Sequence, residues 1–357
     1  MIAIDAMGGD FAPQSVVQAA IQVAKKNIKV GLYGDQVQLF SLLYAYDLNW
    51  EQLPIQVIHC SQVIEMTDVA SLSIIRKRDA SLVRALTDVQ LGKAQAVVTA
   101  GNSGAALVGG TLILGKIPGI DRPAIGNMVP TVHGGHTFCI DLGANVDCKP
   151  EQLVQFAVMG HLYVKMMHHI ANPRVGLLSN GHEPYKGSLL VKQAYALLDE
   201  SKELNFVGNI EPTALFSGVV DVLVSDGFSG NIMLKTAEGT VAAYKSIIKQ
   251  AIKSSWWSRV VSIIGRRLFS AVGSFGDYEK QGGALLLGVR YPVIVAHGCS
   301  KEETIAQAIM FAHKKVKNAF VERFAQQVTQ YLNHRDEDTT IITVKKLHSV
   351  TKFDKSE

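Results

Sequence analysis

The stretch AVVTAGNSGAALVGG, residues 96–110, decides the fold of this chain. Its apolar run, residues 96–98, stops at a small polar turn rich in glycine, and the chain then resumes with the pattern of a helix. This pattern is typical of a buried strand that feeds a helix through a tight turn. The same alternation begins at Ile2 and recurs along the chain. The sequence therefore predicts an α/β fold with a doubly wound, mostly parallel sheet.

A second stretch, VLVSDGFSGNIML at residues 222–234, repeats the pattern of the first. In both, a short apolar run leads into Ser/Thr-x-Gly-x-Ser-Gly, which occupies residues 99–104 and 225–230. Glycines let backbone N–H groups approach an anion closely, serines add hydroxyl donors, and the helix N-terminus that follows contributes a positive dipole. We therefore expect two anion-holding turns at the carboxyl ends of parallel strands.

Size and composition set the remaining bounds. Of the 357 residues, 48% are hydrophobic, which suits a sheet covered by helices on both faces. Residues 1–333 are expected to form the α/β domain, and the charged residues 334–357 a loosely attached tail. The four cysteines form no Cys-x-x-Cys pair, which favours a reducing cytoplasm over a disulfide framework or a zinc knuckle. The net charge of +4 gives no indication of a nucleic-acid partner.

Targeting and nucleotide-binding motifs are missing from the sequence. The opening MIAIDAMGGD lacks the basic and apolar regions of a signal peptide, and no apolar run reaches the roughly 18 residues that cross a bilayer. Residues 110–116 match the letters Gly-x-x-x-x-Gly-Lys, but Ile117 stands where a phosphate loop needs Ser or Thr to bind magnesium. No Gly-x-Gly-x-x-Gly fingerprint occurs either. The sequence thus gives no support to a nucleotide-dependent enzyme.

Three groups of polar residues are candidates for binding. The basic cluster at residues 76–78 is either a solvated helix face or part of an anion site. Glu183 and Lys186 share a loop after a strand, where they either hold a polar substrate or form a local salt bridge. Residues 141–147, which include Asp141 and Asn145, supply either metal ligands or the hydrogen bonds of a turn.

An acid-free segment follows the second turn. Between Gly239 and Gly276 there is no Asp or Glu, yet there are six Lys or Arg residues. A helical pattern there places the tryptophans and aliphatic residues largely on one side. Such a helix either packs onto a core or meets anionic lipid or an acidic protein, and its exclusively positive charge favours the second. We expect a protruding amphipathic segment at residues 240–276, whose surface includes Lys245, Lys249, Lys253, Trp256, Trp257, Arg259, Ile263 and Arg266.

Several long motifs, in order along the chain, resemble those of a known family. They include IAIDAMGGD at residues 2–10, PGIDRPA at 118–124, DLGANVDCKPEQLVQFA at 141–157, LKTAEG at 234–239 and IVAHG at 294–298, beside the two glycine turns. With them, nearly all of the chain resembles the bacterial phosphate acyltransferases of the PlsX type. The chain departs from the family pattern at SNGHEPYKG, residues 179–187, where Glu183, Lys186 and Gly187 match.

The resemblance implies a fold similar to phosphotransacetylase and to the isocitrate dehydrogenase class. It implies a homodimer, peripheral membrane association and no organic cofactor. The implied reaction converts an acyl-acyl carrier protein and inorganic phosphate into acyl phosphate, which a downstream glycerol-3-phosphate acyltransferase uses for phospholipid synthesis. Two alternatives stay open: a phosphotransacetylase for short acyl-coenzyme A, and a non-catalytic membrane scaffold for lipid synthesis.

This reaction predicts which residues form the site. Phosphate is already a nucleophile, so the protein must hold two anionic partners together and stabilise the oxyanion. The residues expected to act on the reacting groups are Asn102, Ser103, Lys186 and Asp226. The residues expected to bind substrate or phosphate are Arg76, Lys77, Gly101, Gly104, Glu183, Gly227, Ser229, Gly230, Asn231 and Lys235. Since these lie far apart in the sequence, the prediction requires that their loops meet in one cleft.

Overall fold

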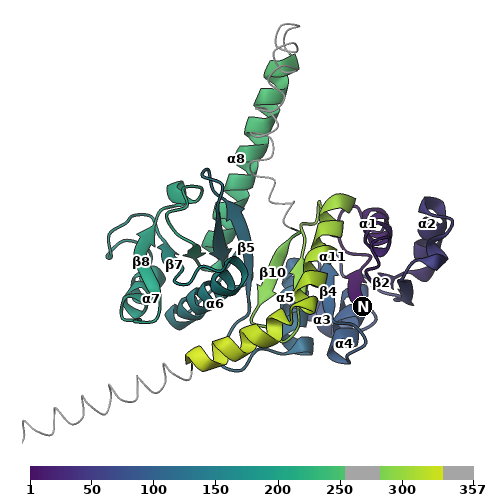
Figure 1. The fold of residues 1–357 in the computed structure, drawn as a ribbon, viewed down its shortest axis with the longest axis horizontal. Helices are drawn as coiled ribbons and strands as arrows, with labels where there is room; N and C mark the ends of the chain where they lie inside the picture. Colours follow the sequence, from purple (N-terminus) through teal and green to yellow (C-terminus); the bar gives the residue numbers. More distant parts are fainter. Residues whose placement is uncertain (254–281, 333–357) are drawn as a thin grey trace, which may run out of the picture.

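The computed structural model describes residues 1–253 and 282–332 and contains one eleven-stranded sheet with helices on both faces (Figure 1). The strand order is β3-β2-β1-β4-β11-β10-β5-β6-β9-β7-β8. The strands are β1 (Ile2–Asp5), β2 (Val30–Gly34), β3 (Ile55–His59), β4 (Ala96–Thr99), β5 (Ala124–Pro130), β6 (His136–Ile140), β7 (Arg174–Leu178), β8 (Asn205–Ile210), β9 (Val222–Val224), β10 (Ala284–Leu287) and β11 (Val293–Val295). The α/β fold class predicted from the sequence is confirmed.

The sheet consists of two parallel groups joined by antiparallel strands. β1, β2, β3, β4 and β11 pair in parallel, as do β6, β7, β8 and β9. β10 is antiparallel to β11 and β5, and β5 is antiparallel to β6. The two parallel groups therefore run in opposite directions. The sequence did not predict β5, because its run AIGNMVP carries Gly, Asn and Pro among the apolar residues. The apolar run at residues 281–288 predicts a segment of the sheet, and β10 lies there.

Strands from both parallel groups end at or near one row of paired residues that crosses the sheet. Val98 pairs with Ile294, which pairs with Leu285, and this row continues through Gly126 to Ile140. β4 ends one residue beyond this row and β6 ends on it. The polar loops after the two groups of strands thus start close to the same central strip.

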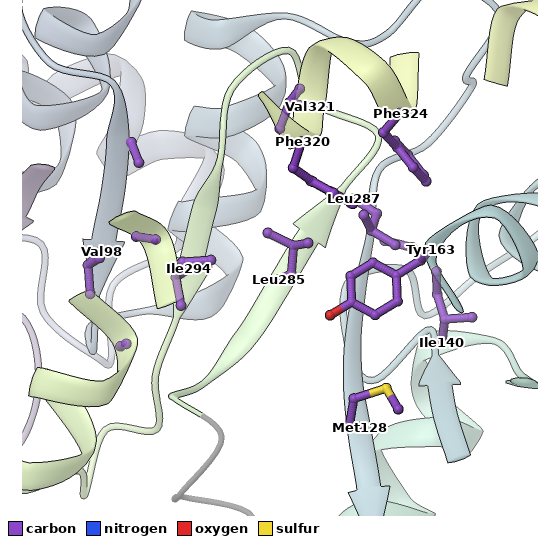
Figure 2. Packing of buried hydrophobic residues seen from close by; sticks show 14 of the residues in the cluster. Val98, Met128, Ile140, Tyr163, Leu285, Leu287, Ile294, Phe320, Val321 and Phe324 are labelled. Atoms are coloured by element: carbon purple, nitrogen blue, oxygen red, sulfur yellow. The ribbon is translucent and has the colours of Figure 1, made fainter. Parts of the chain in front are cut away.

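Helices cover the two faces, with one apolar cluster beneath each. The first cluster joins the sheet to α1 (Gln14–Ala24), α2 (Gln36–Tyr46), α6 (Pro150–His168), α7 (Leu189–Asp199) and α11 (Glu302–Lys317). The second joins it to α3 (Ala70–Arg76), α4 (Ser81–Gln90), α5 (Ser103–Gly109) and α8 (Gly227–Lys253). Short helical turns are η1 (Trp50–Gln52), η2 (Gly110–Leu114) and η3 (Pro212–Ala214). Figure 2 shows the first cluster, where Tyr163 of α6 lies beside Leu287 of β10.

The sequence pattern predicts one helix over residues 66–87 and another over residues 301–330, and the structure interrupts both. The helical pattern at residues 66–87 divides into α3 and α4, because the chain between them turns back and Ala80 pairs with Gln62. The helix expected at residues 301–330 ends at Lys317 and resumes at residue 320, after Ala319 adopts a positive φ of 46°. Both breaks depend on tertiary contacts that a periodic pattern does not reveal.

Helix α8 extends away from the body of the protein (Figure 1). Its outer part is the described portion of the amphipathic segment and carries exposed Tyr244 and Ile247 beside Lys245 and Lys249. None of the described helices is long and apolar enough to span a membrane. Lys253 ends the described helix. The other predicted surface residues, Trp256, Trp257, Arg259, Ile263 and Arg266, lie outside the described residues, as does the predicted tail at 334–357.

Candidate functional site

The two motif regions line one cavity. It has a volume of about 270 Å³ and is lined by the first glycine turn, the flank of α8 and the ends of β10 and β11. Four predicted residues contribute to its wall: Gly101, Ser103, Asn231 and Lys235. The other lining residues include Met66, Asn127, Gly143, His297 and Gly298. Residues from distant parts of the sequence therefore meet in one cleft, although only these four of the predicted residues line it.

A buried aspartate supports the first turn. The Asp5 carboxylate accepts hydrogen bonds from Ser81 Oγ (2.6 Å) and Thr99 Oγ1 (2.7 Å), and Thr99 Oγ1 accepts one from the Gly101 N–H (3.0 Å). Burial raises the pKa of Asp5, and these hydrogen bonds oppose the rise. A Cβ on Gly101 would lie 3.2 Å from Gly8 Cα, so a side chain there would crowd the neighbouring loop. The turn is thus held rigidly at the cavity wall.

A second buried aspartate organises the loop after β6. Asp141 accepts hydrogen bonds from the N–H groups of Ile125 (3.0 Å), Ala144 (3.1 Å) and Asn145 (2.7 Å). Burial raises its pKa, and the hydrogen bonds counteract this. Of the two interpretations of this region, the turn is therefore the one that the structure supports. Among residues 1–253 and 282–332, no group of His, Cys, Asp and Glu is arranged to hold a metal ion.

Asn102 positions a neighbouring segment. Its Oδ1 caps α5 by accepting a hydrogen bond from the Ala105 N–H (3.0 Å). Its Nδ2 lies within hydrogen-bond distance of three backbone carbonyls, those of Glu65, Met66 and Asp68. The side chain therefore fixes residues 65–68 at the cavity rim. Ser103, the next residue, is exposed and lines the cavity.

A charged cluster stands on the α8 side of the cavity. Lys235 Nζ lies 2.7 Å from Glu238 Oε2 and 3.4 Å from His297 Nδ1, and His297 Nε2 lies 3.2 Å from Glu238 Oε1. Burial raises the pKa of Glu238, but the hydrogen bonds from His297 and Lys235 outweigh it and leave the pKa lowered. Glu238 and His297 thereby hold the Lys235 ammonium at the cavity wall, where it can attract an anion.

The glycines of the second turn do not line this cavity. A Cβ on Gly227 or Gly230 would come closer than 3.0 Å to residues of the 141–145 loop, so both glycines serve close packing. Asp226 accepts hydrogen bonds from the N–H and the Oγ of Ser229, both at 2.8 Å, and so caps α8. Gly104 likewise lies outside the cavity lining and packs on Ala70 of α3.

The basic cluster does not converge on the cavity. Lys77 Nζ forms an ion pair with Asp68 (2.5 Å) and donates to the Val63 carbonyl (2.8 Å). Arg76 is exposed at the end of α3 and is not among the lining residues. The structure therefore does not bring the two predicted phosphate-binding cations, Arg76 and Lys77, to the cavity wall.

Lys186 and Glu183 lie on a different loop, next to a larger groove. This groove has a volume of about 770 Å³, is mostly apolar and is bounded by the other side of α8, with Phe228, Ser229 and Ile232 in its wall. Gly187 and Ser179 also line it, and Ser179 Oγ is buried without a hydrogen-bond partner. Lys186 and Glu183 fold over Gly181 of the same loop. Helix α8 thus separates the predicted residues into two groups.

Sequence reasoning missed Glu238 and His297. The signals were present: Glu238 lies three residues after Lys235 on the helix that follows the second turn, and His297 lies two residues after the end of the buried strand β11. Met66 was also missed, because its place at the cavity depends on the tertiary hydrogen bonds of Asn102.

Comparison with known proteins agrees with this architecture. Residues 1–323 match the model of a family described as fatty acid synthesis protein. A phosphate acyltransferase from Geobacillus thermodenitrificans is 44% identical over 89% of this chain and 95% of its own length, and one from Dictyoglomus turgidum is 41% identical over 88% and 94%. Among solved structures, a phosphotransacetylase from Streptococcus pyogenes matches with a TM-score of 0.55 and 17% identity over 89% of this chain and 94% of that one. The last match shows a shared fold.

Proposed function

The chain belongs to the fatty acid synthesis protein family, and we propose that it converts an acyl-acyl carrier protein and inorganic phosphate into acyl phosphate and free carrier protein. The curated relatives are named phosphate acyltransferases, so the chain is a transferase of an acyl group. The carrier protein as donor, and the use of acyl phosphate in phospholipid synthesis, are the finer parts of the proposal. The scaffold alternative is set aside because the family consists of enzymes.

One observation carries the proposal: a glycine turn and a lysine held by Glu238 and His297 line the same cavity of about 270 Å³. The volume suits a small oxyanion beside a reacting carbonyl. Ser103 is the first residue of α5 and its hydroxyl can donate to an anion, Gly101 lets the backbone approach closely, and Lys235 contributes a full positive charge from the flank of α8. An inorganic phosphate held between them would be neutralised from two sides.

The chemistry needs positioning more than a strong base. A phosphate oxygen attacks the thioester carbonyl carbon, a tetrahedral oxyanion forms, and the carbon–sulfur bond then breaks. The proton of the phosphate ends on the thiolate, whose pKa of about 8.5 makes it a good leaving group. Donors around the cavity stabilise the oxyanion as its charge develops. Ser103 and Lys235 are the residues to which we assign this role.

The residues on the loop next to the groove are not part of the mechanism described above. Lys186 and Glu183 match the family motif, and their action on substrate stays a prediction. Asp226 and Asn102 are positioning residues in the proposed mechanism, because their side chains cap α8 and α5.

The proposal also includes how the protein assembles and how it contacts the membrane. A homodimer in the cytoplasm, attached peripherally to an anionic membrane, would deliver acyl phosphate to a downstream glycerol-3-phosphate acyltransferase. The exposed Tyr244 and Ile247 on the outer part of α8, with Lys245 and Lys249 between and beside them, support a lipid-facing role for that helix. Flotation with anionic vesicles tests it: Ile247→Asp should reduce binding, and equal reduction by Val37→Asp on α2 would argue against a specific contact.

The activity is tested by incubating the protein with a long-chain acyl-acyl carrier protein and phosphate and trapping the product with hydroxylamine. Acyl hydroxamate is expected, and it should depend on both substrates. A short acyl-coenzyme A serves as the competing donor and represents the phosphotransacetylase alternative. Faster turnover of the short donor would replace the carrier-protein proposal, and no hydroxamate from either donor would remove the proposed activity altogether.

A further inference from the structure

An exposed apolar and basic surface borders the mouth of the cavity. Its apolar residues are Met66 (50% exposed), Val69 (62%), Leu72 (46%) and Ile75 (57%). Arg76 and Arg78 follow them directly in the sequence, and both are exposed. We call these six residues the α3 surface. A cluster of exposed apolar residues rimmed by charge is typical of a protein-binding site.

The α3 surface is anchored to the site by several contacts. Met66 itself lines the cavity, and Asn102 holds residues 65–68 through its Nδ2. Helix α3 packs on α5, where a Cβ on Gly104 would lie 3.2 Å from Ala70 Cβ. The side of α3 that faces inward carries buried Ser73 and Ile74, so Leu72 and Ile75 point outward. A partner seated on this surface would therefore stand directly beside Ser103.

The charge of the α3 surface favours an acidic partner. Lys77 is neutralised by Asp68, but among the described residues no ion pair involves Arg76 or Arg78. Glu65 contributes one exposed carboxylate nearby, which leaves an excess of positive charge. Apolar residues supply contact area, and unpaired arginines at the edge steer a negatively charged partner into place.

We propose that the α3 surface is the docking site for the acyl donor, a small acidic carrier protein that presents its thioester on a flexible arm. The docked carrier places the thioester at the mouth of the cavity that Ser103 and Lys235 line. This inference rests on the proposed function, because it takes the donor to be a carrier protein. It gives the basic cluster of the sequence a role outside the cavity, in partner recognition.

The test compares two donors that share the thioester and differ in the carrier. Arg78→Glu and Ile75→Ser are assayed with an acyl-acyl carrier protein and with the same acyl group on coenzyme A, at saturating phosphate. Each variant is expected to raise KM for the carrier-protein donor about tenfold and to change kcat/KM for the coenzyme A donor less than twofold. Raising the salt concentration should weaken carrier binding by the unaltered protein more than by Arg78→Glu.

Matched controls are Lys192→Glu, an exposed lysine on α7, and Val37→Ser, an exposed valine on α2. Both should leave the KM for either donor unchanged. The docking proposal is overturned if the α3 variants affect both donors equally, if they affect neither, or if Ile75→Ser alters the oligomeric state in solution. Turnover of the coenzyme A donor with none of the carrier donor would instead reject the carrier-protein part of the proposed function, and with it the docking site.

Discussion

Replacing Gly230 with Ala tests how tightly the second glycine turn is packed. A Cβ at Gly230 would come closer than 3.0 Å to the Asp141 carbonyl oxygen and to Ser225 Oγ. The carbonyl belongs to the backbone, and Asp141 is fixed by several hydrogen bonds, so neither atom can move aside freely. Gly104 has the same place in the first turn, but its Cβ would meet Ala70 and Asn102 at 3.2 Å.

This difference sets the expected magnitudes. Gly230→Ala adds a methyl group that must push α8 away from β6, and we expect it to lower the free energy of unfolding by about 3 kcal/mol. Gly104→Ala gains up to about 1 kcal/mol in helix propensity, which offsets its tight contacts, so its net effect should stay within about 1 kcal/mol. A shift of α8 also moves Asn231 and Lys235 at the cavity, and kcat/KM for phosphate should fall by about 100-fold in Gly230→Ala.

Urea unfolding followed by circular dichroism measures the stabilities, and hydroxylamine trapping measures the activity. The reasoning is refuted if Gly230→Ala unfolds at the same urea concentration as the unaltered protein and keeps its KM for phosphate. It is also refuted if Gly104→Ala lowers the free energy of unfolding more than Gly230→Ala does, because the Cβ contacts at Gly104 would then be the more severe.

Three further predictions follow from the site and the core. Lys235→Gln should raise KM for phosphate at least tenfold. Because Lys235 lines the cavity, this increase should exceed the one that Lys186→Gln causes. Steady-state kinetics with varied phosphate measures both KM values. Glu238→Gln should raise the same KM by a smaller factor, because it weakens the contact that positions Lys235 without removing the cation. A larger increase than that of Lys235→Gln would contradict the positioning role of Glu238. Burial lowers the pKa of Lys315 from 10.5 to about 7, so the unfolded chain binds more protons between these values and the free energy of unfolding rises with pH across this range. The ammonium of Lys315 is destabilised on folding despite its contacts with the rings of Tyr163, Phe311 and Phe320. Lys315→Met should therefore stabilise the protein by up to about 5 kcal/mol at pH 6 and by less at pH 10, whereas exposed Lys314→Met should change little.

Much of the fold could be predicted because its signals are local. The apolar runs at residues 55–59 and 174–178 predict two strands with the limits that β3 and β7 have. The turns after β4 and β9 are where the glycine pattern indicated. The antiparallel strand β5 could not be predicted, since a short run of mixed composition carries no period of its own. The apolar run of β10 indicates a buried segment, but nothing in it indicates that the strand lies antiparallel between β11 and β5. Their pairing is decided by the strands on either side.

The candidate site was predictable only in part, for a similar reason. Ser103 lies within the first repeated motif and Lys235 follows the second, so a local pattern pointed to both. The pairing of Lys77 with Asp68, which keeps this lysine from the cavity, depends on how the chain folds back between α3 and the rim. His297 meets Glu238 across 59 residues of sequence, and no spacing rule relates them.

The two turns look alike in sequence but contribute to the cavity in different ways, and the sheet explains why. β4 and β9 are five strands apart, which is about 24 Å in the plane of a sheet at roughly 4.8 Å per strand. A cavity of about 270 Å³ cannot extend over that distance from turn to turn. The first turn contributes its own loop, Gly101 and Ser103, because it lies at the wall.

The second turn reaches the same wall through the helix that it starts. Lys235 lies eight residues after Gly227, which is about 12 Å along α8 at 1.5 Å per residue. The glycines at the start of α8 seat the helix against the 141–145 loop and so set the direction in which it runs. If this is correct, a change at Gly230 should alter phosphate binding through Lys235 although Gly230 itself touches no substrate. Addition of Lys235→Gln to Gly230→Ala should then cost less than it does in the unaltered protein, because both changes remove the same contact.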